Sequence, residues 1–213
     1  MKNVRAFLID LDGVIIPYSY HYLAWKQACD DFSIPYTKEQ SVRQKGVSHT
    51  TSLDIVLENS PGEFTEEEKT KLRQRKNQYY QNYIDELNPN KVIFRADEAL
   101  SQAKELGITC ILCSSNYQAK DILKKIGLED KFASVFDPKS LNRFKPNPEI
   151  YLKACESIHL SPCECLVIED SYPTLLETKK CSFNPCYITD YPGENNDGIL
   201  EISALTDIFY YLD

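Results

Sequence analysis

The sequence predicts an α/β protein in which a doubly wound parallel sheet carries an inserted α-helical segment. The first observation is a short apolar run over residues 4–9 that ends in two aspartates, Asp10 and Asp12. The second is the alternation of strand-like and helix-like patterns over residues 90–213, which is typical of βαβ units. The third is a break in this alternation over residues 18–87, where helical patterns occur without a strong strand.

The strands are predicted from short apolar runs that are bounded by turn residues. After the run at 4–9, they are expected at residues 108–113, 134–136, 166–168 and 186–189. The helices are predicted from apolar residues at helical spacing, and several end in Gly or a Lys pair, as helix C-termini do. They are expected at residues 96–106, 118–126, 148–158 and 172–179.

The segment 18–87 is predicted to form a separate helical domain. Its longest helical pattern covers residues 64–84 and begins with Thr-Glu-Glu-Glu. Pro17 and Pro89 bracket the segment and suit the two crossings of a hinge. Because the segment begins directly after the first strand, we expect it to cover the end of that strand as a lid. The predicted boundaries are residues 1–16 and 89–213 for the core and residues 17–88 for the cap.

Length and charge narrow the function classes. With 213 residues, the chain is long enough for one sizeable core and a small inserted domain. A formal net charge of −8 argues against nucleic acid or an anionic membrane as a partner, since both require a basic face. No apolar run approaches about 20 residues, and no charged-then-apolar leader precedes the first strand. We expect a cytoplasmic protein that has no membrane span and is a monomer.

The eight cysteines do not form a zinc pattern. The closest pairs, Cys110 with Cys113 and Cys163 with Cys165, lie in or beside apolar segments and lack a second matching pair. We expect them to be core residues with free thiols, as in a reducing compartment.

Asp10 and Asp12 lie on the turn that ends the first strand. Because strand side chains alternate, both are expected to point the same way, and Gly13 lets the backbone turn sharply beside them. Two converging carboxylates without Lys or Arg nearby are natural ligands for a hard divalent cation such as Mg²⁺. The alternative is an Asp-rich strand end whose side chains only cap a turn.

Two other strand ends carry hydrogen-bond donors. Ser114, Ser115 and Asn116 follow the second strand and can donate to anionic oxygens, or else they form an ordinary helix N-cap. Lys145 stands before Pro146 and ahead of a helix, so that its loop is restrained. It is either one well-placed cation or a solvated loop lysine.

A second acidic pair, Glu169 and Asp170, follows the strand predicted at residues 166–168. Taken alone, the pair could be an acidic N-cap for the next helix. Together, the four strand ends supply metal carboxylates, a nucleophile, an acid, hydroxyls and an ammonium. That combination is what phosphoryl transfer needs.

These residues resemble the motifs of the haloacid dehalogenase superfamily over nearly the whole chain. The motifs occur in order as Asp-x-Asp-Gly-Val from Asp10, the core Ser114, Lys-Pro-x-Pro from Lys145 and Glu-Asp-Ser from Glu169. The predicted cap is similar to that of the β-phosphoglucomutase-like subgroup. The residues that carry this similarity are His21, Trp25, Lys45, Gly46, Val47, Ser48, Ser52, Leu53, Arg75, Lys76 and Asn77. By this resemblance the core is Rossmann-like and the cap is a four-helix bundle.

The resemblance implies Mg²⁺-dependent phosphoryl transfer. Asp10 would be the nucleophile that becomes an aspartyl phosphate, and Asp12 would be the general acid and base. Ser114 and Lys145 would stabilise the transferring oxygens. The implied ligands of Mg²⁺ are Asp10, the backbone carbonyl of Asp12, Asp170 and the adjacent Glu169.

The resemblance also implies which residues meet the substrate, a small phosphorylated metabolite and most simply a sugar phosphate. The implied contacts are His21, Trp25, Lys45, Gly46, Val47, Ser48, His49, Ser52 and Lys76 in the cap, and Ser115 and Asn116 in the core. Without the resemblance, the cap residues would be interpreted as a surface histidine and ordinary helix lysines.

The chain departs from the mutase pattern where a second phosphate would be held. The pattern has an Arg after the Gly-Val-Ser of the cap and a Ser-Lys pair beyond the core Ser. Here His49, Asn116 and Tyr117 stand at those positions. His does not replace the bidentate grip of an Arg, so binding of a bisphosphate should suffer. Candidates to compensate are Arg43, Lys45 and Arg75.

We therefore expect a Mg²⁺-dependent phosphatase of small sugar phosphates. A mutase of the β-phosphoglucomutase type is the second hypothesis, because the sugar-facing cap residues are retained. A catalytically inactive phosphosugar-binding protein is the third hypothesis. The intact core residues argue against it, namely Asp10, Asp12, Lys145 and Asp170. A dehalogenase is disfavoured because Asp12 and the Mg²⁺ carboxylates have no role in displacing halide from carbon.

Overall fold

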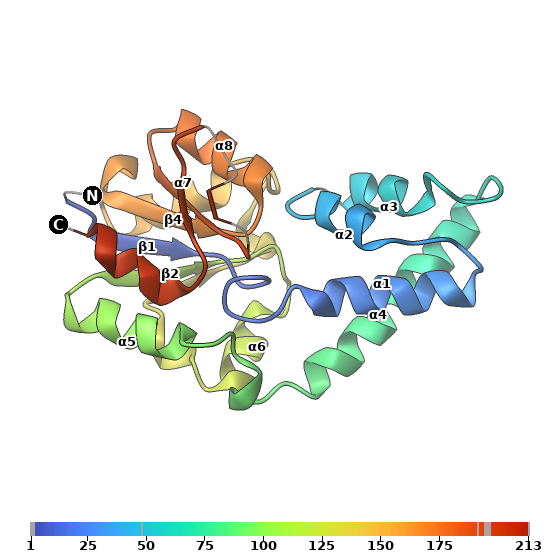
Figure 1. Ribbon diagram of the computed structural model, residues 1–213, viewed down its shortest axis with the longest axis horizontal. Coiled ribbons are helices and arrows are strands. Elements are labelled where there is room, and N and C mark those ends of the chain that lie inside the picture. The colour runs from blue at the N-terminus through green and yellow to red at the C-terminus, as the bar shows by residue number, and fades with distance from the viewer. Residues whose placement is uncertain (1–2, 48, 191, 194–196, 213) are drawn as a thin grey trace. The chain divides into compact units, whose positions relative to one another are not determined.

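The computed structural model describes residues 3–47, 49–190, 192–193 and 197–212, and of His49 it describes the backbone alone. The chain divides into two compact units (Figure 1). One consists of Met1–Pro17 and Asn88–Asp213, and we call it the core unit. The other is Tyr18–Leu87, and we call it the cap unit.

The core unit is built on a six-stranded sheet in the order β3-β2-β1-β4-β5-β6, and every neighbouring pair is parallel. The predicted α/β class with a parallel, Rossmann-like sheet is confirmed. The strand order reverses between β1 and β4, and open α/β sheets bind their ligands at such a switch point. The strands are β1 (Ala6–Ile9), β2 (Thr109–Cys113), β3 (Ser134–Phe136), β4 (Cys165–Glu169), β5 (Asn184–Ile188) and β6 (Leu200–Ile202).

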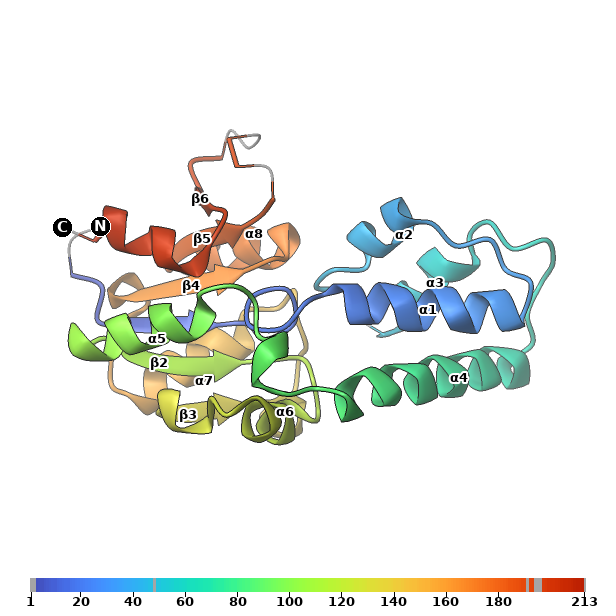
Figure 2. The same ribbon diagram turned by 60° about the horizontal axis from the view of Figure 1, so that its bottom comes forward.

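Helices cover both faces of this sheet. On one face, Leu8 of β1 and Val167 of β4 belong to a buried cluster with Ile150 and Tyr151 of α7 and Leu175 of α8. On the opposite face, α5 packs against β2 and lies beside η5 (Figure 2). The helices are α5 (Ala96–Glu105), α6 (Ala119–Ile126), α7 (Glu149–Ser157) and α8 (Tyr172–Lys180). The 3-10 turns are η1 (Pro89–Lys91), η2 (Glu129–Lys131), η3 (Pro138–Ser140), η4 (Pro162–Glu164) and η5 (Leu205–Tyr211).

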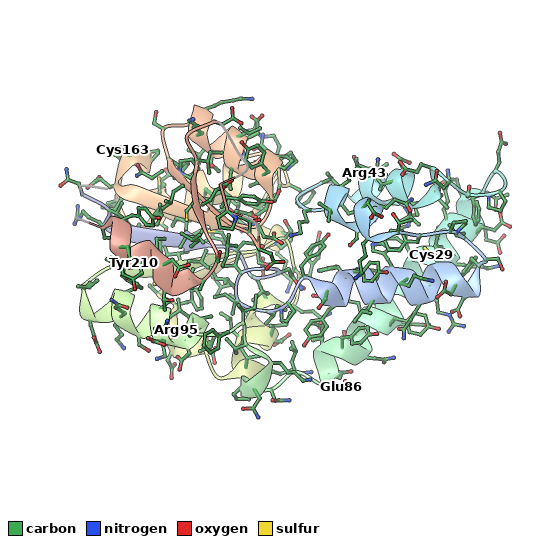
Figure 3. All side chains as sticks on the ribbon, in the orientation of Figure 1. Cys29, Arg43, Glu86, Arg95, Cys163 and Tyr210 are labelled. Carbon is green, nitrogen blue, oxygen red and sulfur yellow. The ribbon has the colours of Figure 1, made fainter. Side chains whose placement is uncertain are left out.

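The elements β6 and η5 were not expected from the sequence. The segment 200–202 has the sequence Leu-Glu-Ile, which is not a continuous apolar run, and β6 is recognised by its pairing with β5. The expectation of buried cysteines is wrong for Cys163, which is exposed because it lies in the turn η4 (Figure 3). All eight thiols are free.

The cap unit holds the four helices α1 (Ser19–Asp31), α2 (Lys38–Arg43), α3 (His49–Leu57) and α4 (Glu66–Asp85). Helix α4 begins with a capping box, because the side chains of Thr65 and Glu68 each accept the backbone N–H of the other residue. Helices α1 and α4 pack along each other, and Trp25, Cys29 and Leu72 are among the side chains buried in the cap core. Among the described residues, no helix is long and apolar enough to cross a membrane.

Candidate active site

Polar residues follow the ends of the two strands that flank the switch point. The register pairs Ile9 of β1 with Ile168 of β4 and with Leu112 of β2. Asp10, the residue after Ile9, therefore lies between Glu169 of β4 and Cys113 of β2. Asp10 is held there by its backbone N–H, which donates to the Ile168 carbonyl at 3.0 Å.

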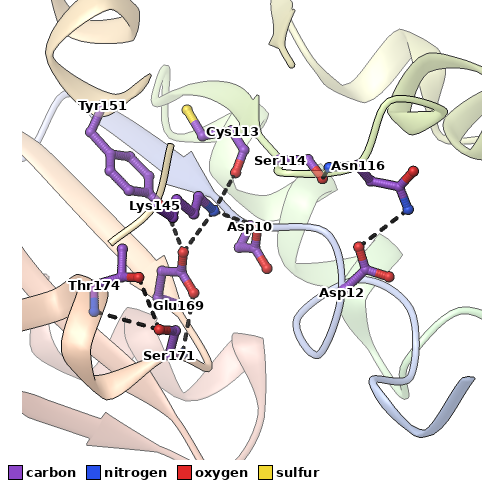
Figure 4. A network of polar contacts seen from close by, with 10 residues as sticks. All are labelled: Asp10, Asp12, Cys113, Ser114, Asn116, Lys145, Tyr151, Glu169, Ser171 and Thr174. Carbon is purple, nitrogen blue, oxygen red and sulfur yellow. Dashed lines mark hydrogen bonds and ion pairs between the residues drawn. The ribbon is translucent and has the colours of Figure 1, made fainter. Parts of the chain in front are cut away.

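Lys145 is the centre of a buried polar network (Figure 4). Its Nζ donates to Asp10 Oδ1 at 2.6 Å, to Glu169 Oε1 at 2.7 Å and to the Cys113 carbonyl oxygen at 2.8 Å. An ammonium has three hydrogens, so these three acceptors use them all. Burial lowers the pKa of Lys145, but Asp10 and Glu169 outweigh burial and raise that pKa above its ordinary value. Lys145 is therefore a permanent cation between two carboxylates.

Three carboxylates converge beside this ammonium. Asp10, Glu169 and Asp170 are 7%, 1% and 4% exposed, and one oxygen of each lies within 4.8 Å of the others. Burial and then the charge of Glu169 raise the pKa of Asp10 well above its ordinary 3.8, while Lys145 opposes them. One ammonium offsets only one of three negative charges. A compact site with oxygen donors and excess negative charge fits Mg²⁺.

Gly13 allows the turn after Asp10 to press against Asp170. Its φ is +94°, and a Cβ at this position would lie 2.0 Å from Asp170 Oδ2. The turn is closed by the Leu11 carbonyl, which accepts the N–H groups of Ile15 and Ile16 at 2.9 and 3.0 Å. Glycine is therefore needed both for the backbone conformation and for the space that the Asp170 carboxylate occupies.

Glu169 is anchored on both of its oxygens. Oε1 accepts the Tyr151 hydroxyl at 2.6 Å in addition to Lys145, and Oε2 accepts the Ser171 N–H at 3.2 Å. Burial and the charge of Glu169 raise the pKa of Tyr151 well above its ordinary value, so the phenol keeps the hydrogen that it donates. Sequence reasoning missed Tyr151. The available signal was a tyrosine six residues after Lys145, on the first turns of the following helix.

Glu149 fixes the loop that carries Lys145. Its Oε1 accepts the Asn142 N–H at 2.9 Å and its Oε2 accepts the Arg143 N–H at 3.0 Å. The Asn142 amide and then Lys153 lower the pKa of Glu149 from 4.5 to about 2. Glu149 was not predicted from the sequence to have this role. An acidic residue in the first turn of a helix is common, and only the folded loop shows which amides it binds.

Asp10 and Asp12 have different hydrogen-bond partners, and the expectation that they point the same way stays a prediction. Strand β1 ends at Ile9, and the alternation of side chains therefore stops before either aspartate. The Asp10 side chain meets Lys145, whereas Asp12 Oδ2 accepts Asn116 Nδ2 at 3.4 Å (Figure 4). The Asp12 carboxylate lies outside the cluster of three carboxylates.

The segment after β2 forms a tight turn. Ser114 is fully buried, and its Oγ accepts the Asn116 N–H at 3.0 Å. An accepting hydroxyl still has its own hydrogen to donate, as the predicted role of Ser114 requires. Ser115, predicted to touch substrate, is exposed.

The cap unit gathers three of the predicted substrate residues. Lys76 Nζ lies 3.3 Å from His21 Nδ1, and it stands over the rings of Tyr80 and Trp25 at 4.6 and 5.8 Å from their centroids. The ring of His21 stacks on Tyr80 with centroids 4.4 Å apart. Trp25 is only 7% exposed and belongs to the cap core.

The other predicted cap residues follow α2, and Ser52 among them belongs to α3. Lys45 stands over the ring of Tyr18 at 5.0 Å, and Gly46 and Val47 are half-buried. Ser52 forms hydrogen bonds within the cap unit, because Gln44 Nε2 donates to its Oγ at 2.8 Å and to its carbonyl oxygen at 2.9 Å. Ser48 and the side chain of His49 lie outside the described residues.

Two of the cations that could compensate for the missing Arg and Lys are paired with carboxylates. Arg43 forms an ion pair with Glu58. The Nε of Arg75 lies 2.8 Å from Asp31 Oδ2, at the C-terminal end of α1.

Comparison with known proteins places this site in a family. A model described as haloacid dehalogenase-like hydrolase matches residues 4–176. A β-phosphoglucomutase of Bacillus subtilis is 36% identical over 171 residues, which cover 79% of this chain and 76% of the relative. A phosphorylated carbohydrates phosphatase of Thermotoga maritima is 26% identical over 206 residues, which cover 95% of this chain and 93% of the relative.

Solved structures agree with the sequence relatives. The crystal structure of a β-phosphoglucomutase from Clostridium difficile aligns with a TM-score of 0.83 and 30% identity, covering 98% of this chain and 95% of the other. The family model extends over most of the chain and includes all four strand ends that carry the polar residues. The chain therefore belongs to the haloacid dehalogenase-like hydrolase family.

Proposed function

We propose that this protein is a Mg²⁺-dependent phosphatase of small sugar phosphates that works through a phosphoaspartyl intermediate on Asp10. The observation that carries the proposal is the buried contact of Asp10 with Lys145 at the switch point of the sheet. The family and its relatives support a phosphatase or a phosphomutase as the enzyme class.

Asp10 is the nucleophile in this proposal. Lys145 binds Oδ1, so Oδ2 is the oxygen that attacks phosphorus in line. The bond from Oδ2 to phosphorus forms as the bond from phosphorus to the sugar oxygen breaks, and Asp12 gives its proton to that leaving oxygen. Asp12 then takes a proton from water, the water oxygen attacks phosphorus, and inorganic phosphate leaves with Asp10 restored.

A phosphate anion can approach these carboxylates only if cations offset the repulsion. Two unit charges about 4 Å apart repel by about 4 kcal/mol at an effective dielectric of about 20. Lys145 supplies one positive charge, but its three ammonium hydrogens are all donated to acceptors within the protein. We therefore assign Lys145 mainly to holding Asp10 and neutralising charge, and Ser114 to donating to a transferring oxygen.

The groups that fit Mg²⁺ are the carboxylates of Asp10 and Asp170 and the backbone carbonyl of Asp12. Glu169 is the adjacent carboxylate of the same cluster. Glu169 is the least available of the carboxylates, because Lys145 and Tyr151 occupy its Oε1. When bound, Mg²⁺ supplies positive charge to the phosphoryl oxygens.

The proposed substrate contacts in the cap remain those named from the resemblance. The cluster of His21, Lys76 and Tyr80 supports them, since it combines a cation, an imidazole and an aromatic face. Such groups suit the polar and apolar faces of a sugar and the charge of its phosphate.

Water is proposed as the second nucleophile because the distal phosphate of a bisphosphate would find few cations. Arg43 and Arg75 are each paired with a carboxylate in the cap. The competing hypothesis is a sugar phosphate mutase, and it is favoured by the 36% identity to a β-phosphoglucomutase.

The test follows phosphate release and isomer formation in parallel. Purified protein is given Mg²⁺ and a panel of sugar phosphates that includes β-glucose 1-phosphate, with Asp10→Asn as the control. We expect phosphate release without glucose 6-phosphate, and no release by Asp10→Asn. Isomer formation in excess of release would establish the mutase, and neither product with binding retained would indicate a binding protein.

A further inference from the structure

We infer that Asn116 is a positioning residue for Asp12, and that its side-chain amide sets the direction in which Asp12 presents its carboxylate. The observation is the contact of Asn116 Nδ2 with Asp12 Oδ2 at 3.4 Å. Both residues belong to the core unit. The inference rests on the proposed function, in which Asp12 is the general acid and base, and it departs from the earlier expectation that Asn116 binds substrate.

The backbone of Asn116 is fixed at both ends. Its N–H donates to Ser114 Oγ at 3.0 Å, and its carbonyl accepts the Ala119 N–H at 3.2 Å. Ser114 is itself tied to the sheet, because its N–H donates to the Phe136 carbonyl at 3.0 Å. Asn116 is therefore attached to β2 and β3 rather than to a mobile loop.

The orientation of the Asn116 amide follows from a third bond. Its Oδ1 accepts the Gln118 N–H at 3.0 Å, and only the oxygen end of the amide can accept. The NH₂ end must then face the opposite side, where Asp12 lies. The turn thus leaves Asn116 one way to point, with a donor aimed at the carboxylate (Figure 4).

The backbone of Asp12 is fixed as well, and the contact with the amide restricts the rotation of the Asp12 side chain. Asp12 forms an isolated bridge with Ile16, and the Gly13 N–H donates to the Ile16 carbonyl at 2.7 Å. Fixing Oδ2 fixes the rotation of the carboxylate and hence the place of Oδ1. A contact of 3.4 Å is long for a resting site, and such catalytic hydrogen bonds tighten in the substrate complex.

A positioning role for Asn116 predicts a dependence of the rate on the leaving group, whereas a role in substrate binding does not. Protonation of the leaving oxygen matters most when that oxygen is strongly basic and matters little when it leaves readily as an anion. A displaced general acid should therefore slow poor leaving groups selectively. A lost binding contact or a disturbed fold should slow every member of a series of similar shape equally.

The experiment measures kcat/KM with Mg²⁺ for a series of substituted phenyl phosphates and plots its logarithm against the pKa of the phenol released. The variants are Asn116→Asp, which keeps an oxygen for the Gln118 N–H but removes the donor, and Asn116→Ala, which removes both. Asp137→Ala is the matched control, because Asp137 Oδ1 accepts the Lys139 N–H at 3.0 Å in the same kind of turn outside the site. Asp12→Asn defines the slope without the acid.

We expect both Asn116 variants to steepen the plot toward that of Asp12→Asn. The loss should be at least about tenfold for the poorest leaving group, since general acid catalysis is worth about 10²–10⁴-fold in all. Adding Asn116→Ala to Asp12→Asn should change nothing further, and Asp137→Ala should follow the wild type. Steepening with this non-additivity supports the inference.

A parallel fall across the series would overturn the inference and return Asn116 to substrate binding or to holding the turn. An unchanged plot would also overturn it. If the wild-type protein with an intact fold released phosphate neither from this series nor from the panel of sugar phosphates, the proposed function would fail, and this assignment would fail with it.

Discussion

Replacing Gly13 by alanine tests whether the turn after Asp10 and the Asp170 carboxylate are built as one unit. A Cβ at Gly13 would lie 2.0 Å from Asp170 Oδ2 and 2.4 Å from Asp170 Cγ. The left-handed backbone costs an L-residue about 1–2 kcal/mol and overpacking costs about 1–3 kcal/mol, so we expect a loss of about 2–5 kcal/mol in the free energy of unfolding. The structure can avoid part of this loss only by moving Asp170 away from residue 13, which would disturb the cluster of carboxylates that fits Mg²⁺.

Two measurements separate these effects. Urea unfolding gives the stability, and calorimetric titration with Mg²⁺ gives the metal affinity. Gly107→Ala is the matched control, because Gly107 also has a positive φ, +72°, but no atom lies within 4 Å of its would-be Cβ. We expect Gly13→Ala to lose more stability than the control and to bind Mg²⁺ more weakly. Equal stability and equal Mg²⁺ affinity in the two variants would refute the argument from close approach.

Two further predictions concern Lys145 and the loop that holds it. Without metal, Lys145→Met should lower the free energy of unfolding by about 3–5 kcal/mol, because it leaves Asp10 and Glu169 buried without their cation. Mg²⁺ should raise the unfolding midpoint of this variant more than that of the wild type. A variant as stable as the wild type would contradict the role of the network. The pKa of Glu149 is lowered to about 2 from 4.5, so its contribution to stability is present above about pH 4.5 and is lost as the pH falls toward about 2. In Glu149→Gln, the unfolding midpoint should no longer show this loss of stability between those pH values. A pH dependence equal to that of the wild type would count against the role of Glu149 in holding the loop.

Five of the six strands could be predicted from the sequence because they contain short apolar runs, whereas β6 could not. The run at 134–136 matches β3 at both ends, and 108–113 differs from β2 by one residue. The four polar strand ends could be placed together because parallel strands bring their carboxyl ends to one edge. The Lys145 contacts with Asp10 and Glu169 follow from that placement, although the contact with the Cys113 carbonyl does not.

Some contacts could not be predicted from the sequence, because they depend on where a strand ends and on how a loop folds back on the sheet. The separate partners of Asp10 and Asp12 could not be predicted from alternation, because alternation holds only inside a strand and β1 ends before both residues. Tyr151 and Glu149 were missed because their partners are a carboxylate on another strand and amides of a preceding loop. These contacts exist only after the chain has folded.

The burial of Lys145 explains why its loop is held so firmly. A buried ammonium is stable only against its acceptors, and a small displacement would leave it and two carboxylates without partners. The fold therefore fixes the acceptors independently of the lysine: Tyr151 and the Ser171 N–H hold Glu169, and the backbone of Asp10 is bound to β4. Glu149 fixes the loop from the other side through two amides. The position of Asp10 is thus determined by the protein itself, and in the proposed mechanism Mg²⁺ would balance charge rather than arrange the protein around Asp10.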